Sequence, residues 1–233
     1  MKSRLQSAFT LIEMLVVISI IAILAAFAVP ALTSALTKGQ MTGTMNNGRQ
    51  MYLAAQQMAL DGSANSDPNL GWPTDVGDTT LNAYVTRLVT QNYLKVGDVQ
   101  KLLSGPGASA QVTSSTAGTP PVTTITVTGT AALKIYPVAD ADASNVIFAT
   151  SRNYTYNSAL TPTTGGPPPV ANNPFGDKGF IVQRKGGDAS VLRPNNATDG
   201  GNITQFESQV GKKPGEAQGT ASAGDPGGVL KQP

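Results

Sequence analysis

Apolar residues run almost unbroken through positions 14–32, where only Ser19 and Pro30 interrupt them. At a rise of about 1.5 Å per residue, a helix of this length spans roughly the 30 Å hydrocarbon core of a bilayer. Lys2 and Arg4 precede the run, and positively charged flanks stay on the cytoplasmic side of a membrane. The pattern therefore predicts a single membrane-spanning helix with a cytoplasmic N-terminus and an exported C-terminal domain.

Beyond this run, apolar residues recur every three or four positions, which is typical of one buried face of a helix. These positions are Leu32, Leu36, Met41, Met45, Gly48, Tyr52, Ala55 and Ala59. Asp61 and Gly62 then predict the end of the helix. A helix over residues 9–61 would be about 80 Å long. Residues 9–32 need cover from lipid or from other copies, whereas residues 33–62 form an amphipathic half that can pack on a domain.

The remaining chain predicts a small exported domain over residues 63–210. A second helix can begin at Asp78 or Thr79 and bury Leu81, Tyr84, Val85, Leu88 and Val89, and Asp98 can cap a short third one. Residues 105–121 predict a flexible loop. Strands are expected over residues 122–128, 132–138, 145–149, 152–157, 179–184 and 190–193. Residues 211–233 have few bulky side chains and predict a disordered tail. The expected class is α+β, with a long N-terminal helix packed on a small antiparallel sheet.

Glu13 breaks the apolar pattern at the start of the membrane helix, and it is the only acidic residue among the first sixty. A carboxylate within a bilayer costs roughly 2.5–3.5 kcal/mol on insertion scales. Two interpretations remain open from this residue alone. Glu13 can stay hydrated among lipid headgroups, or it can meet a positive charge from another subunit inside the membrane.

The residues around Glu13 form a longer motif. A short basic leader precedes Ala8-Phe9-Thr10-Leu11-Ile12-Glu13, and the apolar helix follows. This arrangement resembles the class III signal of type IV pilins and type II secretion pseudopilins. The resemblance implies cleavage between Ala8 and Phe9, methylation of the new Phe9 amine, and a role for Glu13 in filament assembly. It also implies that Pro30 loosens the helix. The family usually has Gly where this chain has Ala8.

The same resemblance implies a location and a set of partners. Residues 1–8 would be a cytoplasmic leader, and the chain would cross the bacterial inner membrane once, with its C-terminal domain in the periplasm. A prepilin peptidase and methyltransferase, an inner-membrane assembly platform and other pilins or pseudopilins would be its partners in a homo-oligomeric filament. Two other classes remain open. One is a membrane-anchored binding domain that does not polymerise, and the other is a secreted protein cleaved after Ala28, where Ala26-Phe27-Ala28 has the form of a signal-peptidase site.

Composition argues against catalysis. Cysteine and histidine are both absent, which removes disulfides, thiolate metal sites and the commonest general base. No hydrolase, nucleotide-binding or zinc motif is present, so we expect no enzyme and no cofactor. A net charge of +2 gives no basic surface for nucleic acid. Calcium has only weak candidates in Asp140, Asp142, Asp188 and Asp199, so no metal ligands are assigned.

Within the filament class, the sequence favours a secretion pseudopilin. Many type IV pilins close their C-terminal loop with a disulfide, which this chain cannot form. The stretch Asn173-Pro174-Phe175-Gly176-Asp177 is similar to the Asp-Pro-Trp-Gly-Asn of G-type major pseudopilins. We therefore predict a structural subunit of a type II secretion pseudopilus, with a type IV major or minor pilin as the alternative. The tyrosines Tyr136, Tyr154 and Tyr156 are expected to pack across a sheet.

Overall fold

A computed structural model describes residues 10–163, 173–225 and 229–230. The chain divides into two compact units, residues 1–39 and 40–233, and helix α1, Leu11–Asn65, begins in the first and ends in the second. In the described part of the second unit, three further α-helices, one 3₁₀ helix and two antiparallel sheets follow α1, joined by loops. The long N-terminal helix and small antiparallel sheets confirm the predicted α+β class.

The C-terminal end of α1 lies four residues beyond the predicted stop at Asp61. Ser66 adopts a left-handed conformation with φ 53°, and the Asp67 N–H donates to the carbonyl of Gly62 over 3.0 Å. This is the pattern of a Schellman motif, which satisfies a carbonyl in the last helical turn. Gly62 therefore lies inside the helix, where a Cβ atom would come within 2.0 Å of the Leu70 carbonyl oxygen. Its role is close packing rather than termination.

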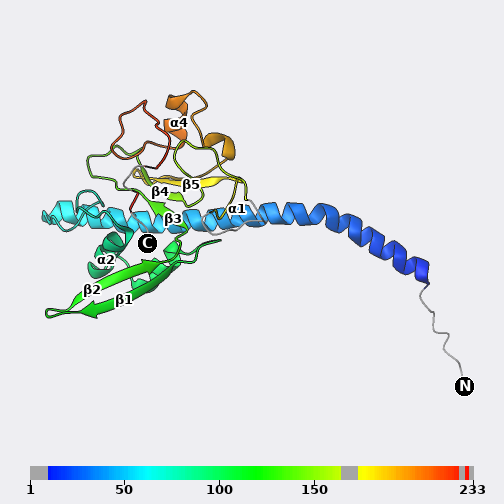
Figure 1. The fold of residues 1–233 in the computed structure, drawn as a ribbon, viewed down its shortest axis with the longest axis horizontal. Coiled ribbons are helices and arrows are strands. Elements are labelled where there is room, and N and C mark those ends of the chain that lie inside the picture. The colour runs from blue at the N-terminus through cyan, green and yellow to red at the C-terminus, as the bar shows by residue number, and fades with distance from the viewer. Residues whose placement is uncertain (1–9, 164–172, 226–228, 231–233) are drawn as a thin grey trace, which may run out of the picture. The chain divides into compact units, whose positions relative to one another are not determined.

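Residues 40–65 of α1 run through the centre of the second unit (Figure 1). Helix α2, Leu81–Thr90, and the β1–β2 sheet lie on one side, and the larger sheet lies on the other. Because these elements contact the helix from two sides, its buried face is wider than the single row of apolar residues that the sequence predicts. The buried positions are Met41, Thr44, Gly48, Met51, Tyr52, Ala54, Ala55, Met58, Ala59 and Gly62.

The two short helices begin differently from the prediction. Thr80 caps α2, with its side-chain oxygen accepting from the Ala83 N–H over 3.2 Å. Helix α3, Val96–Leu103, starts before Asp98, whose carboxylate accepts from the Lys95 N–H over 3.2 Å. Of the apolar positions predicted for α2, Leu81, Tyr84, Val85 and Leu88 are buried and Val89 is partly buried. Val99, Leu102 and Leu103 of α3 are buried as well.

The smaller sheet pairs strand β1, Gln111–Ala117, with strand β2, Val122–Thr128. The prediction of β2 is confirmed, but the prediction of a loop over residues 105–121 is wrong for residues 111–117. The β1 sequence holds a single large apolar residue, Val112, and so shows no alternation. Its extended conformation comes from pairing with β2, which local sequence patterns do not reveal.

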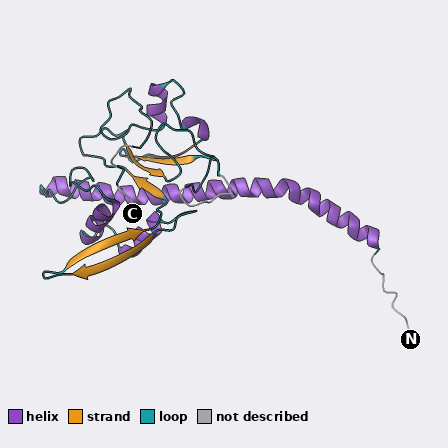
Figure 2. Cartoon of the chain, viewed as in Figure 1, coloured by secondary structure: helices purple, strands orange, loops and turns teal. Residues whose placement is uncertain are grey.

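The larger sheet has the order β3-β4-β5-β6, with every neighbouring pair antiparallel. Its strands are Leu133–Ile135, Ile147–Ser151, Phe180–Arg184 and Ala189–Leu192. These correspond to four predicted strands with shifted ends (Figure 2). The predicted strand over residues 152–157 is wrong, because this segment forms turns. Tyr154 and Tyr156 are buried there and donate to the carbonyls of Ala197 and Gly211, each over 3.0 Å.

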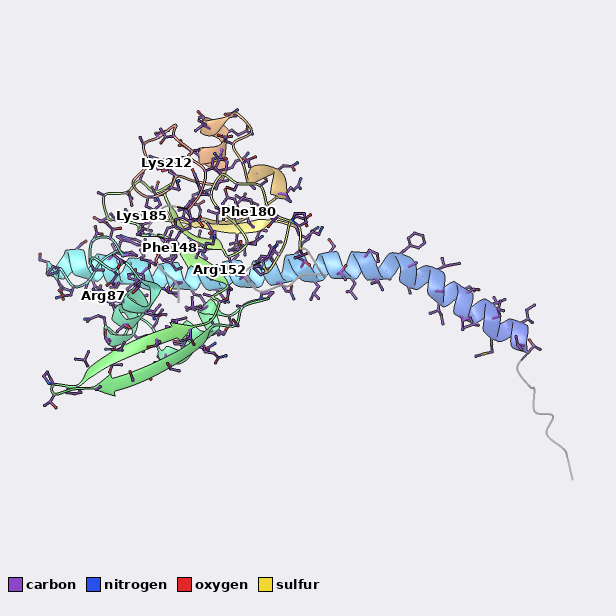
Figure 3. The ribbon with its side chains drawn as sticks, in the orientation of Figure 1. Arg87, Phe148, Arg152, Phe180, Lys185 and Lys212 are labelled. Atoms are coloured by element: carbon purple, nitrogen blue, oxygen red, sulfur yellow. The ribbon has the colours of Figure 1, made fainter. Side chains whose placement is uncertain are left out.

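Buried cores cover both faces of the larger sheet. On the α1 side, Phe148 contacts Tyr52 and Trp72, and each of these ring pairs has a centroid distance of 5.8 Å. Trp72 is thus a packing residue of this core. On the opposite side, Phe180 stacks on Tyr154 with a centroid distance of 3.9 Å. Figure 3 shows Phe148 and Phe180 on the two neighbouring central strands.

Residues 211–225 close the second of these cores, although a disordered tail was predicted over residues 211–233. Lys213 is 5% exposed, and its ammonium donates to the carbonyls of Ser222 and Gly224, each over 2.9 Å. Asp225 accepts from the Lys134 ammonium and the Tyr136 hydroxyl, each over 2.7 Å. Burial, together with the nearby Asp225 charge, raises the pKa of Tyr136 well above its usual value. Hydrogen-bonded charges, rather than bulky apolar residues, hold this segment.

The 3₁₀ helix Pro194–Asn196 and helix α4, Ile203–Gln209, complete the cover of this core. Phe206 of α4 contacts Tyr156 edge to face, with ring centroids 5.2 Å apart. The second core therefore depends on segments that are distant in sequence.

Candidate assembly site on the N-terminal helix

The first unit presents apolar side chains on every side of α1. From residue 10 to residue 36, every side chain is exposed, and Figure 3 shows these side chains extending outward all around the helix. The large apolar ones include Leu11, Ile12, Val16, Ile20, Leu24, Phe27 and Leu32, each at least 47% exposed. Among the described residues, α1 is the one helix long and apolar enough to cross a membrane. Exposed apolar surface of this extent marks contact with lipid or protein.

Glu13 lies in the first turn of α1 and is held by Thr10. The Thr10 N–H and hydroxyl both donate to the same carboxylate oxygen, over 2.8 and 2.7 Å. The Glu13 N–H donates back to the Thr10 hydroxyl oxygen over 3.3 Å. This is a capping box, in which a Thr at the N-cap and a Glu three residues later satisfy each other's polar groups.

The capping box changes what Glu13 can do. Thr10 supplies two donors to one carboxylate oxygen, which lowers the cost of placing the charge beside an apolar helix. The carboxylate remains exposed and close to the N-terminal end of α1. It is therefore a negative charge at the edge of an apolar surface, available to a cation from outside the chain. Sequence reasoning missed Thr10, although the spacing Thr-x-x-Glu is itself the signature of a capping box.

Three other predicted residues bear on processing and flexibility. Ala8 and Phe9 both lie outside the described residues. Pro30 lies within α1, and the helix continues through it. Proline has no N–H, so one backbone hydrogen bond of the preceding turn is missing. The Thr33 hydroxyl donates to the Pro30 carbonyl over 2.9 Å. Loosening of the helix at Pro30 remains a prediction.

The weak calcium candidates are engaged with protein donors. Lys185 donates to the carbonyls of Asp140 and Asp142 over 2.5 and 2.7 Å, so an ammonium already occupies that turn. Asp188 pairs with Arg184, and Asp199 accepts from Asn157 and from a backbone N–H. Across the described ranges, no group of three or more acidic, Cys or His residues could hold a metal ion.

The segment compared with G-type pseudopilins is a packed turn. Phe175 is fully buried against Met41 and Ile181, and Gly176 has a positive φ of 55°. Its geometry is explained by packing on α1.

Comparison with known proteins finds a family model and several relatives that match this chain. Residues 3–29 match the family model described as the prokaryotic N-terminal methylation motif. One type IV major fimbrial protein FimA of Dichelobacter nodosus is 32% identical over 165 residues, which cover 70% of this chain and 81% of the relative. Another FimA from the same organism is 42% identical over 74 residues, covering 32% of this chain and 47% of that relative. No solved structure matches the chain. By its methylation motif and its similarity to fimbrial subunits across most of its length, the chain belongs to the family of type IV pilins.

Proposed function

We propose that this protein is a structural subunit of a type IV pilus, in which copies assemble through residues 9–32. The observation that carries the proposal is an apolar helix surface that the described part of the chain leaves uncovered, in a protein whose C-terminal domain has its own core. The sequence favoured a secretion pseudopilin. The relatives are named as type IV major fimbrial proteins, so the pilus alternative is now better supported.

In the proposed sequence of events, the subunit first inserts into the inner membrane with its N-terminus in the cytoplasm. A prepilin peptidase cleaves between Ala8 and Phe9 and methylates the new amine. Cleavage removes Lys2 and Arg4 and leaves a single positive charge at Phe9. The methylation-motif match over residues 3–29 supports this step.

Glu13 then guides assembly through its charge. Before assembly, hydrogen bonds from Thr10 lower the free-energy cost of placing the Glu13 carboxylate in the membrane. When the subunit joins a filament, Glu13 attracts the Phe9 amine of a neighbouring copy, and this attraction fixes the axial register. A charge pair in a medium of low dielectric constant is far stronger than one in water. The apolar helices then bury one another inside the filament.

The charge at Glu13 can be tested with a variant that keeps the cap. Glu13→Gln retains an oxygen that can accept from Thr10 but removes the charge. We expect normal membrane insertion and cleavage, and loss of filaments in electron micrographs. The matched control is Asp98→Asn, because Asp98 occupies the same capping position in α3. This control should form filaments. Normal filament yield from Glu13→Gln would refute the proposed role.

A further inference from the structure

The β1–β2 hairpin is an exposed ribbon without charged residues. No Asp, Glu, Lys or Arg occurs between Lys101 and Lys134. Every residue of β1 is exposed except Val112, which is half-buried. Ile125 and Val127 of β2 are buried and fix the base of the ribbon to the domain core. The ribbon continues away from α2 toward its turn (Figure 2). Its distal half is therefore open to contact.

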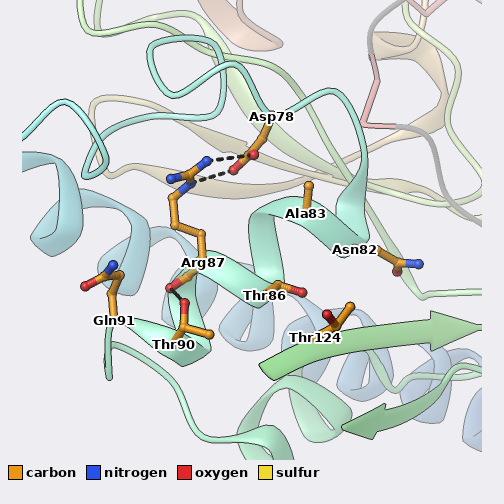
Figure 4. Close-up of a pocket in the computed structure, with 8 residues that line it drawn as sticks. All are labelled: Asp78, Asn82, Ala83, Thr86, Arg87, Thr90, Gln91 and Thr124. Carbon is orange, nitrogen blue, oxygen red and sulfur yellow. Dashed lines mark hydrogen bonds and ion pairs between the residues drawn. The ribbon is translucent and has the colours of Figure 1, made fainter. Parts of the chain in front are cut away.

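Side chains from two helices close both edges of the ribbon at its base. On the β1 edge, Gln100 of α3 accepts from the Val112 N–H over 2.7 Å. On the β2 edge, Thr86 and Asn82 of α2 accept from the backbone N–H groups of Ile125 and Val127 over 2.9 and 3.0 Å. Figure 4 shows Asn82 and Thr86 on α2, beside β2 and Thr124. The backbone groups at the base of the ribbon thus have partners outside the hairpin.

Farther along β1, the outer edge is open. Backbone groups of a strand point alternately to its two edges, and the Val112 N–H points away from β2, toward Gln100. The N–H and carbonyl groups of Ser114 and Thr116 therefore point the same way. In the described part of the chain, no residue bonds to these backbone groups. An extended strand could pair with them.

The larger sheet protects its edges, and this makes β1 an exception. Leu230 donates its N–H to the Ile135 carbonyl over 2.9 Å, which covers the outer edge of β3. The other edge strand, β6, has four residues and lies between Asp188 and Arg193. Covering segments, short length and flanking charges are the usual means by which proteins prevent edge-to-edge pairing. Among the described residues, none of these devices protects the distal edge of β1.

We propose that the outer edge of β1 pairs, antiparallel, with the same edge of a second copy in a neighbouring filament. This inference rests on the proposed pilus function. The edge is self-complementary: Ser114 of one copy would lie opposite Thr116 of the other, and each such pair would exchange both N–H···O bonds. Ser115 would lie on the two-fold axis, where a small uncharged side chain avoids both a clash and a repulsion. A two-fold contact joins filaments rather than extending one, because subunits within a filament join head to tail.

A single contact of this size is weak, since it buries far less than the roughly 1,000 Å² of a stable interface. Between two filaments the same contact becomes stable, because each filament displays many copies and simultaneous contacts gain affinity through avidity. We therefore expect the detergent-solubilised subunit to remain unpaired through this edge, while assembled filaments form lateral bundles.

The test compares bundling of purified filaments by electron microscopy and low-speed sedimentation. Thr116→Pro removes an outward N–H without breaking the pairing with β2, and Ser114→Lys places a charge on the edge. We expect both variants to lose bundles while filament length stays unchanged. The controls are Thr123→Pro, which removes an outward N–H from the opposite edge, and Thr128→Lys, which adds the same charge at the base of the ribbon. Both should bundle like the unmodified protein.

Three results would overturn the inference: bundles at the unmodified level in Thr116→Pro and Ser114→Lys, single filaments from the unmodified protein, or failure of folded Thr116→Pro to assemble. The last result would place this edge inside the filament. Absence of filaments from the unmodified protein would instead refute the pilus function, and the inference with it.

Discussion

The two halves of α1 both carry apolar side chains, but these lie in opposite environments. In residues 11–36 every side chain is exposed, whereas residues 40–62 include ten buried positions that contact elements on two sides. The buried half uses small and flexible residues, such as Ala55, Met51 and Met58, which fit between close neighbours. The exposed half uses Ile, Leu and Val, which suit lipid and other helices. One continuous helix thus joins a finished core to a surface that still requires a partner.

The largest expected effect comes from removing a buried side chain in the packed half. Met58 is fully buried, so Met58→Ala should lower the free energy of unfolding by about 2–5 kcal/mol. Val17→Ala in the exposed half removes a side chain that is 46% exposed. It should leave unfolding of the C-terminal domain unchanged. Chemical denaturation of the full chain in mild detergent, followed by near-UV circular dichroism, measures both. Equal losses from the two variants would contradict the division of the helix.

A smaller effect separates Gly62, inside the packed half, from Gly39, which lies just before it. A Cβ at Gly62 would lie 2.0 Å from the Leu70 carbonyl oxygen, whereas one at Gly39 would have no neighbour within 4 Å. Gly62→Ala should therefore destabilise the domain by about 1–3 kcal/mol, the usual cost of overpacking. Gly39→Ala should stabilise its helical turn by about 1 kcal/mol. Thermal unfolding reports the first change and hydrogen exchange around residue 39 reports the second. Unchanged domain stability in Gly62→Ala would contradict this expectation, because it would mean that the backbone at Leu70 moves aside at little cost.

Features determined by local sequence were predictable. The apolar run and the three-to-four-residue spacing after it place α1 without knowledge of any other element. The apolar stripe of α2 and strand β2 were found in the same way, because each shows the period of its own structure. The width of the buried face of α1 was not predictable. It depends on how many elements surround the helix, and Met51 and Met58 gave no local sign of this.

Features determined by distant partners were missed. Strand β1 is extended because it pairs with β2, and residues 152–157 turn because Tyr154 and Tyr156 reach Ala197 and Gly211. The C-terminal segment is held by Lys213 and Asp225, and composition alone cannot show that such charges find buried partners. In the assembly site, Glu13 was identified from its position. Its partner Thr10 was missed even though the capping signature was present.

The most direct test of this account is the intact mass and N-terminal sequence of the protein extracted from membranes. We expect a chain that begins at Phe9 and carries one added methyl group. Such a chain would show that the prepilin pathway processes this protein. A chain that begins at Val29 would make it a secreted protein, and an uncleaved chain that begins at Met1 would leave a simple anchor. Either of these results would contradict assembly through the processed N-terminus of α1.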